Sequence, residues 1–193
     1  MKICVYAASG DDLKQEYFRA ARELGTLIAG HGHTLVFGGG TGGLMGETAR
    51  GVHDAGGEII GIAPKFFDEP GVLYKECSDF IFTETVRERK GLMEDMADAF
   101  IVLPGGIGTF EEFFETLTLK QLGAHGKPIA ILNTLGYYTA LDALLRQMAD
   151  DGFMSKSCLM LYALRDTPAA AVEHAETEKP LSGSVRRLRD YAK

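Results

Sequence analysis

Short apolar runs alternate with amphipathic stretches along almost the whole chain, and this alternation limits the possible folds more than any other feature. Strands are predicted at 2–8, 33–40, 57–64, 79–85, 99–106, 127–133 and 158–165. Helices are predicted at 13–28, 43–56, 85–97, 109–122, 137–151 and 168–178. The strands stay apolar along their length, which is typical of a parallel sheet covered on both faces. The sequence therefore predicts an α/β fold, a doubly wound, Rossmann-like parallel sheet with helices on both faces.

Length and charge narrow the organisation and the partners. The 193 residues, 46% of them hydrophobic, suit a single domain, predicted at 1–178 and followed by a loosely held tail at 179–193 that contains Pro180 and Gly183. The formal net charge of -7 offers no basic face for nucleic acid or for an anionic membrane. We therefore expect neither as a partner, and any bound anion must be held locally.

The cysteines and the sequence ends bear on the compartment. Cys4, Cys77 and Cys158 are odd in number and widely spaced, which favours small buried side chains over disulfides or a zinc site. We see no charged-then-apolar leader at the start of the sequence, and no apolar run reaches the about 18 residues that span a bilayer. A cytoplasmic protein is the expectation.

Two strands end in glycine-rich turns, where ligands of such sheets bind. The first turn, GGGTGGLMG at 38–46, contains a GxGxxG pattern between a strand and a helix. Binding of NAD would also need an acidic residue at the end of the next strand, and that strand ends in Ala-Pro-Lys at 63–65. The pattern alone therefore does not favour a dinucleotide.

The second turn, PGGIGT at 104–109, is the better candidate for an anion site. Its glycines let the backbone approach a ligand, and a helix predicted to open at Thr109 aims its free N–H groups and positive dipole end at the turn. No GK[ST] follows the glycines, so a nucleoside triphosphate bound through Mg²⁺ is not indicated. The turn favours a monophosphate.

Glu112 has two interpretations. With Thr109 it forms a TxxE capping box, which would satisfy two donors at the helix start. A helical wheel places Glu112 nearly opposite the predicted buried stripe, where a solvated side chain is the default. That stripe consists of Phe110, Phe113, Phe114 and Leu117. The alternative is a catalytic carboxylate beside the glycine turn.

Arg89 also has two interpretations. It falls within an apolar helix face made by Val86, Met93, Met96 and Ala97. Arginine is rarely buried without an anionic partner. Either it forms a structural ion pair, or, with Lys90 at the edge of the face, it meets a ligand anion or the carboxylate after the second glycine turn.

Taken in order and with this spacing, GGGTGGLMG, RERK and PGGIGTFEE resemble the LOG family of cytokinin riboside 5′-monophosphate phosphoribohydrolases, long mislabelled lysine decarboxylases. The resemblance runs from ICVYAAS to about DDGFM. It implies hydrolysis of the N-glycosidic bond of AMP or an N6-substituted relative to free base and ribose 5-phosphate. A homodimer or higher oligomer with sites near the subunit boundary is also implied, and Leu119, apolar on the predicted outer helix face, agrees with it.

By this resemblance Arg89 and Glu112 are the catalytic pair. The implied substrate-binding residues are Ser9, Lys90, Gly105, Gly106, Gly108, Thr109, Glu111 and Thr118. The chain departs from the family pattern at Val86, where methionine is usual, and in YAASG, where a glycine and a second serine are replaced. The loop FFDEPG leaves Asp68 or Glu69 to contact the base, so base preference stays open.

The implied chemistry suits these residues, because cleavage of a ribosyl C–N bond builds positive charge on the sugar that a carboxylate can stabilise. No metal or organic cofactor is expected. The alternative function is a non-catalytic nucleotide carrier or sensor on the same fold. Phe66 and Phe67 could stack a base or pack internally. The histidines, expected to be solvated or capping, are His31, His33, His53, His125 and His174.

Overall fold

The computed structural model describes residues 1–179, so all but the first residue of the predicted tail lies outside the described residues. The strands are β1 (Lys2–Tyr6), β2 (Thr34–Phe37), β3 (Glu58–Pro64), β4 (Asp79–Thr83), β5 (Ala99–Val102), β6 (Ile129–Leu132) and β7 (Ala163–Arg165). The α-helices are α1 (Gln15–Gly30), α2 (Gly43–Asp54), α3 (Val86–Met96), α4 (Ile107–Gln121), α5 (Thr139–Asp150) and α6 (Pro168–Thr177). Short 3₁₀ turns are η1 (Lys65–Phe67), η2 (Thr134–Gly136) and η3 (Lys156–Met160).

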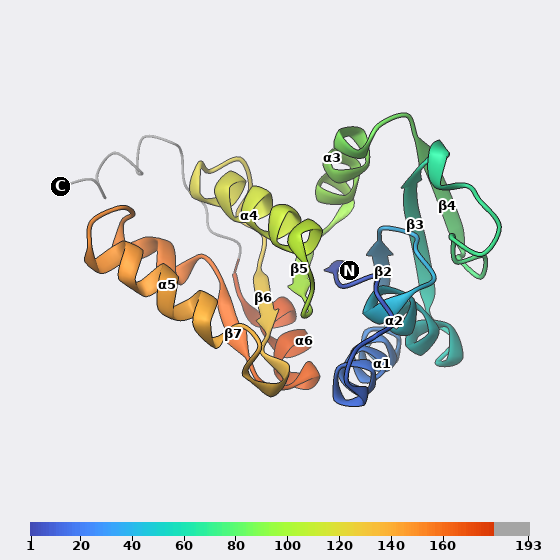
Figure 1. Ribbon diagram of the computed structural model, residues 1–193, viewed down its shortest axis with the longest axis horizontal. Coiled ribbons are helices and arrows are strands. Elements are labelled where there is room, and N and C mark those ends of the chain that lie inside the picture. The colour runs from blue at the N-terminus through green and yellow to red at the C-terminus, as the bar shows by residue number, and fades with distance from the viewer. Residues whose placement is uncertain (180–193) are drawn as a thin grey trace.

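The strands form one sheet in the order β4-β3-β2-β1-β5-β6-β7, and every pair is parallel. The predicted fold class is thereby confirmed (Figure 1). The order reverses between β1 and β5, where Tyr6 pairs with Val102. In an open α/β sheet, ligands bind outside the carboxyl ends of the strands at such a reversal point.

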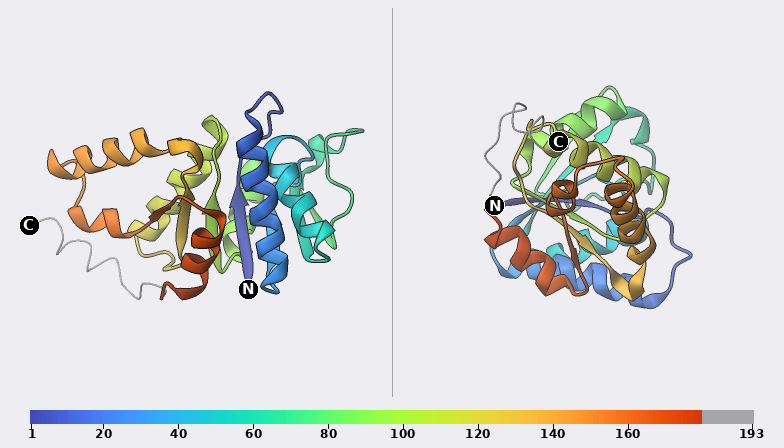
Figure 2. Two further views of the ribbon diagram at one scale, coloured as in Figure 1. Left: turned by 90° about the horizontal axis from the view of Figure 1, so that it is seen from below. Right: turned by 90° about the vertical axis from the view of Figure 1, so that its left-hand side faces the viewer.

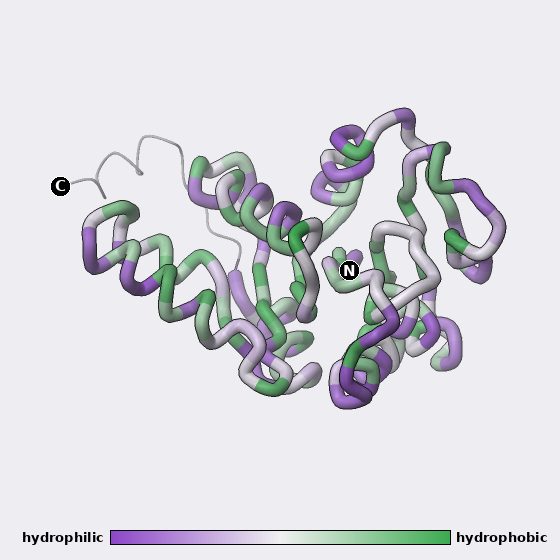
Figure 3. Tube along the Cα trace, viewed as in Figure 1, coloured by the Kyte–Doolittle hydropathy of each residue, from purple (hydrophilic) through white to green (hydrophobic). Residues whose placement is uncertain are grey.

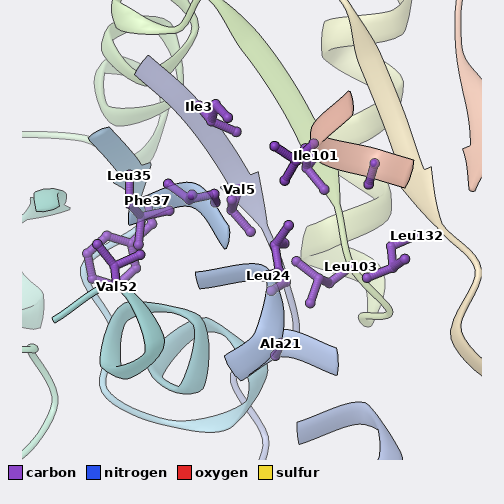
Figure 4. Packing of buried hydrophobic residues seen from close by; sticks show 14 of the residues in the cluster. Ile3, Val5, Ala21, Leu24, Leu35, Phe37, Val52, Ile101, Leu103 and Leu132 are labelled. Atoms are coloured by element: carbon purple, nitrogen blue, oxygen red, sulfur yellow. The ribbon is translucent and has the colours of Figure 1, made fainter. Parts of the chain in front are cut away.

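Helices cover both faces of the sheet, as Figure 2 shows from two further directions. Alternate strand residues point to opposite faces, so β1 contributes Ile3 and Val5 to one core and Cys4 and Tyr6 to the other. The first core packs against α1, α2 and α6, and its centre is drawn in Figure 4. The second packs against α3, α4 and α5. Helix α5 alternates hydrophobic and hydrophilic residues along its length (Figure 3).

Several predicted bounds were wrong: the strands expected at 33–40 and 99–106 end earlier, at Phe37 and Val102, and the first helix starts at Gln15 rather than at 13. The last strand was expected at 158–165, but its first half forms η3 and only Ala163–Arg165 pairs with β6. Helix α4 begins at Ile107 rather than at Thr109, with Gly106 as its N-cap. Among the described residues no helix is both long enough and apolar enough to cross a membrane.

Helices α1 and α2 approach each other so closely that two glycines are required. A Cβ on Gly25 would lie 2.1 Å from the carbonyl oxygen of Thr48, and one on Gly51 would lie 2.3 Å from that of Arg22. These obstacles are backbone atoms, which a rotamer change cannot move. The contact fixes α2, and with it the first glycine turn, against the sheet.

We expect Gly25→Ala to lower the free energy of unfolding by at least about 2 kcal/mol, because the helices must separate to admit the methyl group. Gly30→Ala, at the end of the same helix with nothing within 4 Å of its Cβ position, is the matched control. Since alanine is the better helix former, that variant should be neutral or stabilised by up to about 1 kcal/mol. Urea unfolding measures both, and equal effects would contradict the close-contact explanation.

Candidate functional site

The loops after β1, β2 and β5 meet at the point where the strand order reverses. The amide of Ala8, after β1, donates to the carbonyl of Pro104, after β5, at 3.1 Å. The amide of Met45, in the first turn of α2, donates to the carbonyl of Ala8 at 3.1 Å. The carboxylate of Asp11 accepts from the amide of Gly43 at 2.7 Å. The two glycine turns are therefore tied together through the exit of the central strand.

An ion pair between Arg89 and Glu112 lies beside these turns. Helix α3 precedes β5 in the chain and α4 follows it. Both helices pack on the same face of the sheet, so the two side chains come from that face (Figure 1). Nη2 of Arg89 donates to Oε1 of Glu112. The two side chains are 14% and 12% exposed, so the pair is largely buried yet still reached by solvent. The predicted meeting of Arg89 with the carboxylate after the glycine turn is present.

The surroundings of Arg89 leave room for its guanidinium and leave one of its donors free. Thr85 caps the start of α3 by accepting from the amide of Glu88 at 3.1 Å, which places Arg89 one turn into the helix. A Cβ on Gly38, at the end of β2, would lie 3.2 Å from Nη1 of Arg89. The first glycine turn thus makes room for the arginine. Nε of Arg89 is buried and has no hydrogen-bond partner among residues 1–179, so it can donate to a ligand.

The carboxyl group of Glu112 is poised to titrate near neutrality. Burial raises its pKa to about 7, and Glu111 adds to the rise, while the positive charge of Arg89 opposes both. Burial wins because the ion pair lies in a region of low dielectric constant, where an ionised carboxylate loses its hydration. A carboxyl group with such a pKa in a ligand site is a candidate for acid–base or electrostatic catalysis.

A second set of charges lies next to the pair. Nζ of Lys90 contacts the carboxylates of Glu111 and Glu115, and its side chain is only 11% exposed. Burial lowers the pKa of Lys90, but its hydrogen bonds to the two carboxylates outweigh that effect, so the pKa is raised and the side chain stays charged. Glu111 is 54% exposed, which leaves it able to contact a ligand.

The second glycine turn opens α4 differently from the predicted arrangement. Because α4 begins at Ile107, Thr109 lies in its first turn and cannot be the N-cap, so the predicted capping box with Glu112 is wrong. The N–H groups of residues 107–109 have no partner within the helix. Glu112 is also not on a solvated face. The expected stripe is wrong in part, because Phe114 is 38% exposed while Thr109, Thr116 and Lys120 are buried.

The three glycines of PGGIGT have different reasons to be glycine. A Cβ on Gly105 would lie 2.1 Å from Oγ1 of Thr109, so packing within the turn requires a glycine there. Nothing lies within 4 Å of the Cβ positions of Gly106 and Gly108, and neither residue has a positive φ. The fold itself would accept a side chain at both. A ligand that approaches the backbone at the helix start explains these two glycines.

Other predicted site residues lie farther out. Ser9 is exposed in the loop after β1, where its carbonyl packs on the first glycine turn. Thr118 is exposed on α4, two turns and about 10 Å along the axis beyond Glu111 and less than one turn beyond Glu115. The remaining candidates, Phe66, Phe67, Asp68 and Glu69, are all exposed in the loop between β3 and β4.

Two tyrosines that the sequence did not single out support the second turn. The hydroxyl of Tyr137 donates to the carbonyl of Gly105 at 2.6 Å, and that of Tyr138 donates to the carbonyl of Leu103 at 2.7 Å. Both lie between β6 and α5 and are therefore more than 25 residues after the turn in the sequence. Paired tyrosines after a strand are the only signal for them, and it does not name their acceptors.

The comparisons with known proteins agree on one family. A family model described as "possible lysine decarboxylase" matches residues 45–175. The cytokinin riboside 5′-monophosphate phosphoribohydrolase LOG2 of Arabidopsis thaliana is 40% identical over 156 residues, which are 81% of this chain and 73% of that protein. LOG3 of the same plant is 36% identical over 191 residues, 99% and 83% of the two chains.

The solved structures bear on the fold. A molybdenum cofactor carrier protein from Chlamydomonas reinhardtii superposes with a TM-score of 0.70 at 22% identity, covering 98% of each chain. At that identity the likeness shows a shared architecture and nothing about ligands.

Proposed function

This chain belongs to the family described as possible lysine decarboxylases, which includes the LOG phosphoribohydrolases, and from that premise we propose that it hydrolyses the N-glycosidic bond of a purine nucleoside 5′-monophosphate. The substrate is AMP or an N6-substituted relative, and the products are free base and ribose 5-phosphate. In the balanced reaction the C–N bond breaks, the hydroxyl of water joins the anomeric carbon, and the remaining proton goes to the base.

The observation that carries the proposal is the buried Glu112 carboxyl, paired with Arg89 near the start of α4, which no side chain caps among the described residues. As the C–N bond breaks, positive charge grows on the sugar, and the carboxylate of Glu112 stabilises it or takes a proton from the attacking water. Both roles need the ionised form. The pKa of about 7 keeps a large share of that form available near neutrality.

Arg89 and the second glycine turn have positioning roles in this scheme. Arg89 holds Glu112 in place with one nitrogen and can donate to a substrate oxygen with its free Nε. The N–H groups at the start of α4 bind the 5′-phosphate, with the positive end of the helix dipole behind them. Lys90 and Glu111, which form an ion pair one residue before or after each member of the Arg89–Glu112 pair, are assigned contacts to the sugar or the phosphate.

The test is a panel of nucleosides and nucleotides assayed for base release. AMP should be turned over with a kcat/KM at least about a hundredfold above that of adenosine, because phosphate binding supplies the positioning energy that the nucleoside lacks. Equal kcat/KM values would contradict the phosphate site. Saturable AMP binding without any base release would favour the alternative function, a nucleotide carrier or sensor, over the enzyme.

We further propose a homodimer, or a higher oligomer, that works in the cytoplasm. Phe114, Thr118 and Leu122 recur every four residues along α4 and its C-cap and are all exposed, so two large apolar side chains lie on a stripe that residues 1–179 leave uncovered. Leu119, expected to face a partner, is half-buried beside the stripe. A second copy on this stripe would bring Thr118 to a subunit boundary. Sedimentation should give at least twice the 20.9 kDa chain mass, and an active monomer would refute the dimer.

A further inference from the structure

A second cluster of polar side chains lies away from the nucleotide site. His31 and His33 flank Gly32 in the tight turn between α1 and β2, and Glu176 reaches them from the last turn of α6. Oε1 of Glu176 is 2.8 Å from Nδ1 of His31 and 2.7 Å from Nε2 of His33. One carboxylate oxygen therefore contacts both imidazole rings.

Rigid backbone builds this cluster. The amide of His31 donates to the carbonyl of Leu27 at 3.0 Å and that of His33 donates to Ile28 at 2.9 Å, so both residues are fixed by the end of α1. Gly32 has a φ of +72°, which glycine adopts without strain and which turns the chain so that both rings face α6. Figure 2 (left) shows the N-terminus, the end of α1 and the end of α6 at one end of the molecule. That end is opposite the carboxyl ends of the strands.

We propose that His31, His33 and Glu176 form a binding site for a divalent transition-metal ion of the zinc type. The three candidate ligand atoms lie within 4.8 Å of one another, so an ion with bonds of about 2.0–2.2 Å to nitrogen and oxygen can touch all three after a small outward shift of the carboxylate. Two imidazoles and one carboxylate suit Zn²⁺, Co²⁺ or Ni²⁺ and are poor ligands for Mg²⁺. Water would complete the coordination.

The charges around the cluster are compatible with a cation. Hydrogen bonds from the two imidazoles lower the pKa of Glu176, so its carboxylate is ionised at neutral pH. A further neighbour is the amino group of Met1, 3.4 Å from Nδ1 of His33. Metal binding to Nε2 leaves the ring proton on Nδ1, facing this amino group, so the amino group has to turn away. Because protons compete with a metal ion for imidazole and carboxylate ligands, binding weakens as the pH falls.

The bound ion would link the α1–β2 turn to α6, which belong to opposite ends of the chain sequence. The contact between His33 and Glu176 spans 143 residues, so the site closes only in the folded protein. A metal ion that binds the folded state but not the unfolded state raises the stability of the protein by mass action. Its role is structural, because the nucleotide site lies at the other end of the sheet.

The experiment is titration of the full-length, chelator-treated protein with ZnCl₂. Calorimetry measures binding, and the unfolding temperature measures the effect of the ion on stability. We expect saturable binding of one ion per chain and a rise in Tm that MgCl₂ does not produce. His33→Gln and His31→Gln should each weaken Zn²⁺ binding by at least about tenfold. His53→Gln, which removes an exposed histidine outside the cluster, is the matched control and should bind as the wild type does.

Cobalt distinguishes this site from the cysteines. Co²⁺ bound here should give a visible spectrum without the near-ultraviolet band of a cobalt thiolate, and His31→Gln should abolish it. The proposal fails if Zn²⁺ does not bind, if the two histidine variants bind it as the wild type does, or if a thiolate band appears in its place. The Tm of each variant without metal reports whether the substitution itself disturbs the fold.

Discussion

Replacing Glu112 by Gln should lower kcat for base release by at least about a hundredfold, with AMP still bound and the fold intact. Glutamine keeps the size of the side chain and can still accept a hydrogen bond from Arg89, but it carries no charge for the developing oxocarbenium ion and cannot take a proton from water. The loss therefore falls on kcat rather than on KM. Steady-state base release and a separate measurement of AMP binding check it.

Glu111→Gln is the control, since Glu111 lies in the same helix turn and is half exposed. That change should weaken substrate contacts more than chemistry, and so raise KM more than it lowers kcat. A Glu112→Gln variant that keeps more than about a third of the wild-type kcat would exclude the catalytic assignment. A capping role can no longer explain a loss, because Glu112 lies beyond the first turn of α4.

The same variant has a signature in stability. The pKa of Glu112 is raised from 4.5 to about 7 in the folded chain, so folding favours the protonated group. The stability it contributes is complete below about pH 4.5 and is lost as the pH rises through 7. The free energy of unfolding of Glu112→Gln minus that of the wild type should therefore rise as the pH is raised from 4.5 to above 7.

Arg89→Gln should reduce kcat/KM at pH 7 by at least about a hundredfold and move the rising limb of its pH profile upward from about 7. The positive charge of Arg89 is the main effect that lowers the pKa of Glu112, so its removal leaves burial opposed only by the smaller effect of Lys90, and fewer carboxylates are ionised. The loss of Nε and of the hold on Glu112 adds to the fall. The measurement is kcat/KM for AMP from pH 5 to 9.

Two comparisons make this prediction specific. Arg87→Gln removes an equal charge from the exposed face of the same helix and should leave both rate and midpoint near the wild type. Arg89→Lys keeps the charge without the planar fork, so it should restore the midpoint more fully than the rate. An unshifted midpoint in Arg89→Gln would show that Arg89 does not control the ionisation of Glu112.

The fold could be predicted well from the sequence because buried parallel strands are uninterrupted apolar runs, which are easy to identify. Uninterrupted apolar runs such as AFIV and IAIL became β5 and β6, and the alternation with helices determined the layers. The burial of Arg89 was also visible, since its place in an apolar helix face does not depend on distant contacts. Helical periodicity predicts burial reliably where one face of a helix packs against one sheet surface.

The start of α4 was missed for a physical reason. Thr109 followed three residues later by Glu112 has the pattern of a capping box, so local preference put the helix start at Thr109. The helix begins two residues earlier, at Ile107, and its N-cap Gly106 leaves the backbone exposed for a ligand. The burial of Glu112 was missed because a helical wheel sorts side chains by polarity, and this helix buries Thr116 and Lys120 while it exposes Phe114. Such inversions are expected at functional sites.

The position of the Arg89–Glu112 pair on either side of β5 bears on how the protein folds. Its two members are only 23 residues apart, whereas the histidines contact Glu176 across more than 140 residues. Loop-closure entropy grows with the length of chain enclosed, so forming this pair costs less entropy than forming the contacts of the histidines with Glu176. The αβα unit from α3 to α4 can therefore bring its arginine and glutamate together before β6, β7 and α6 have been added to the sheet.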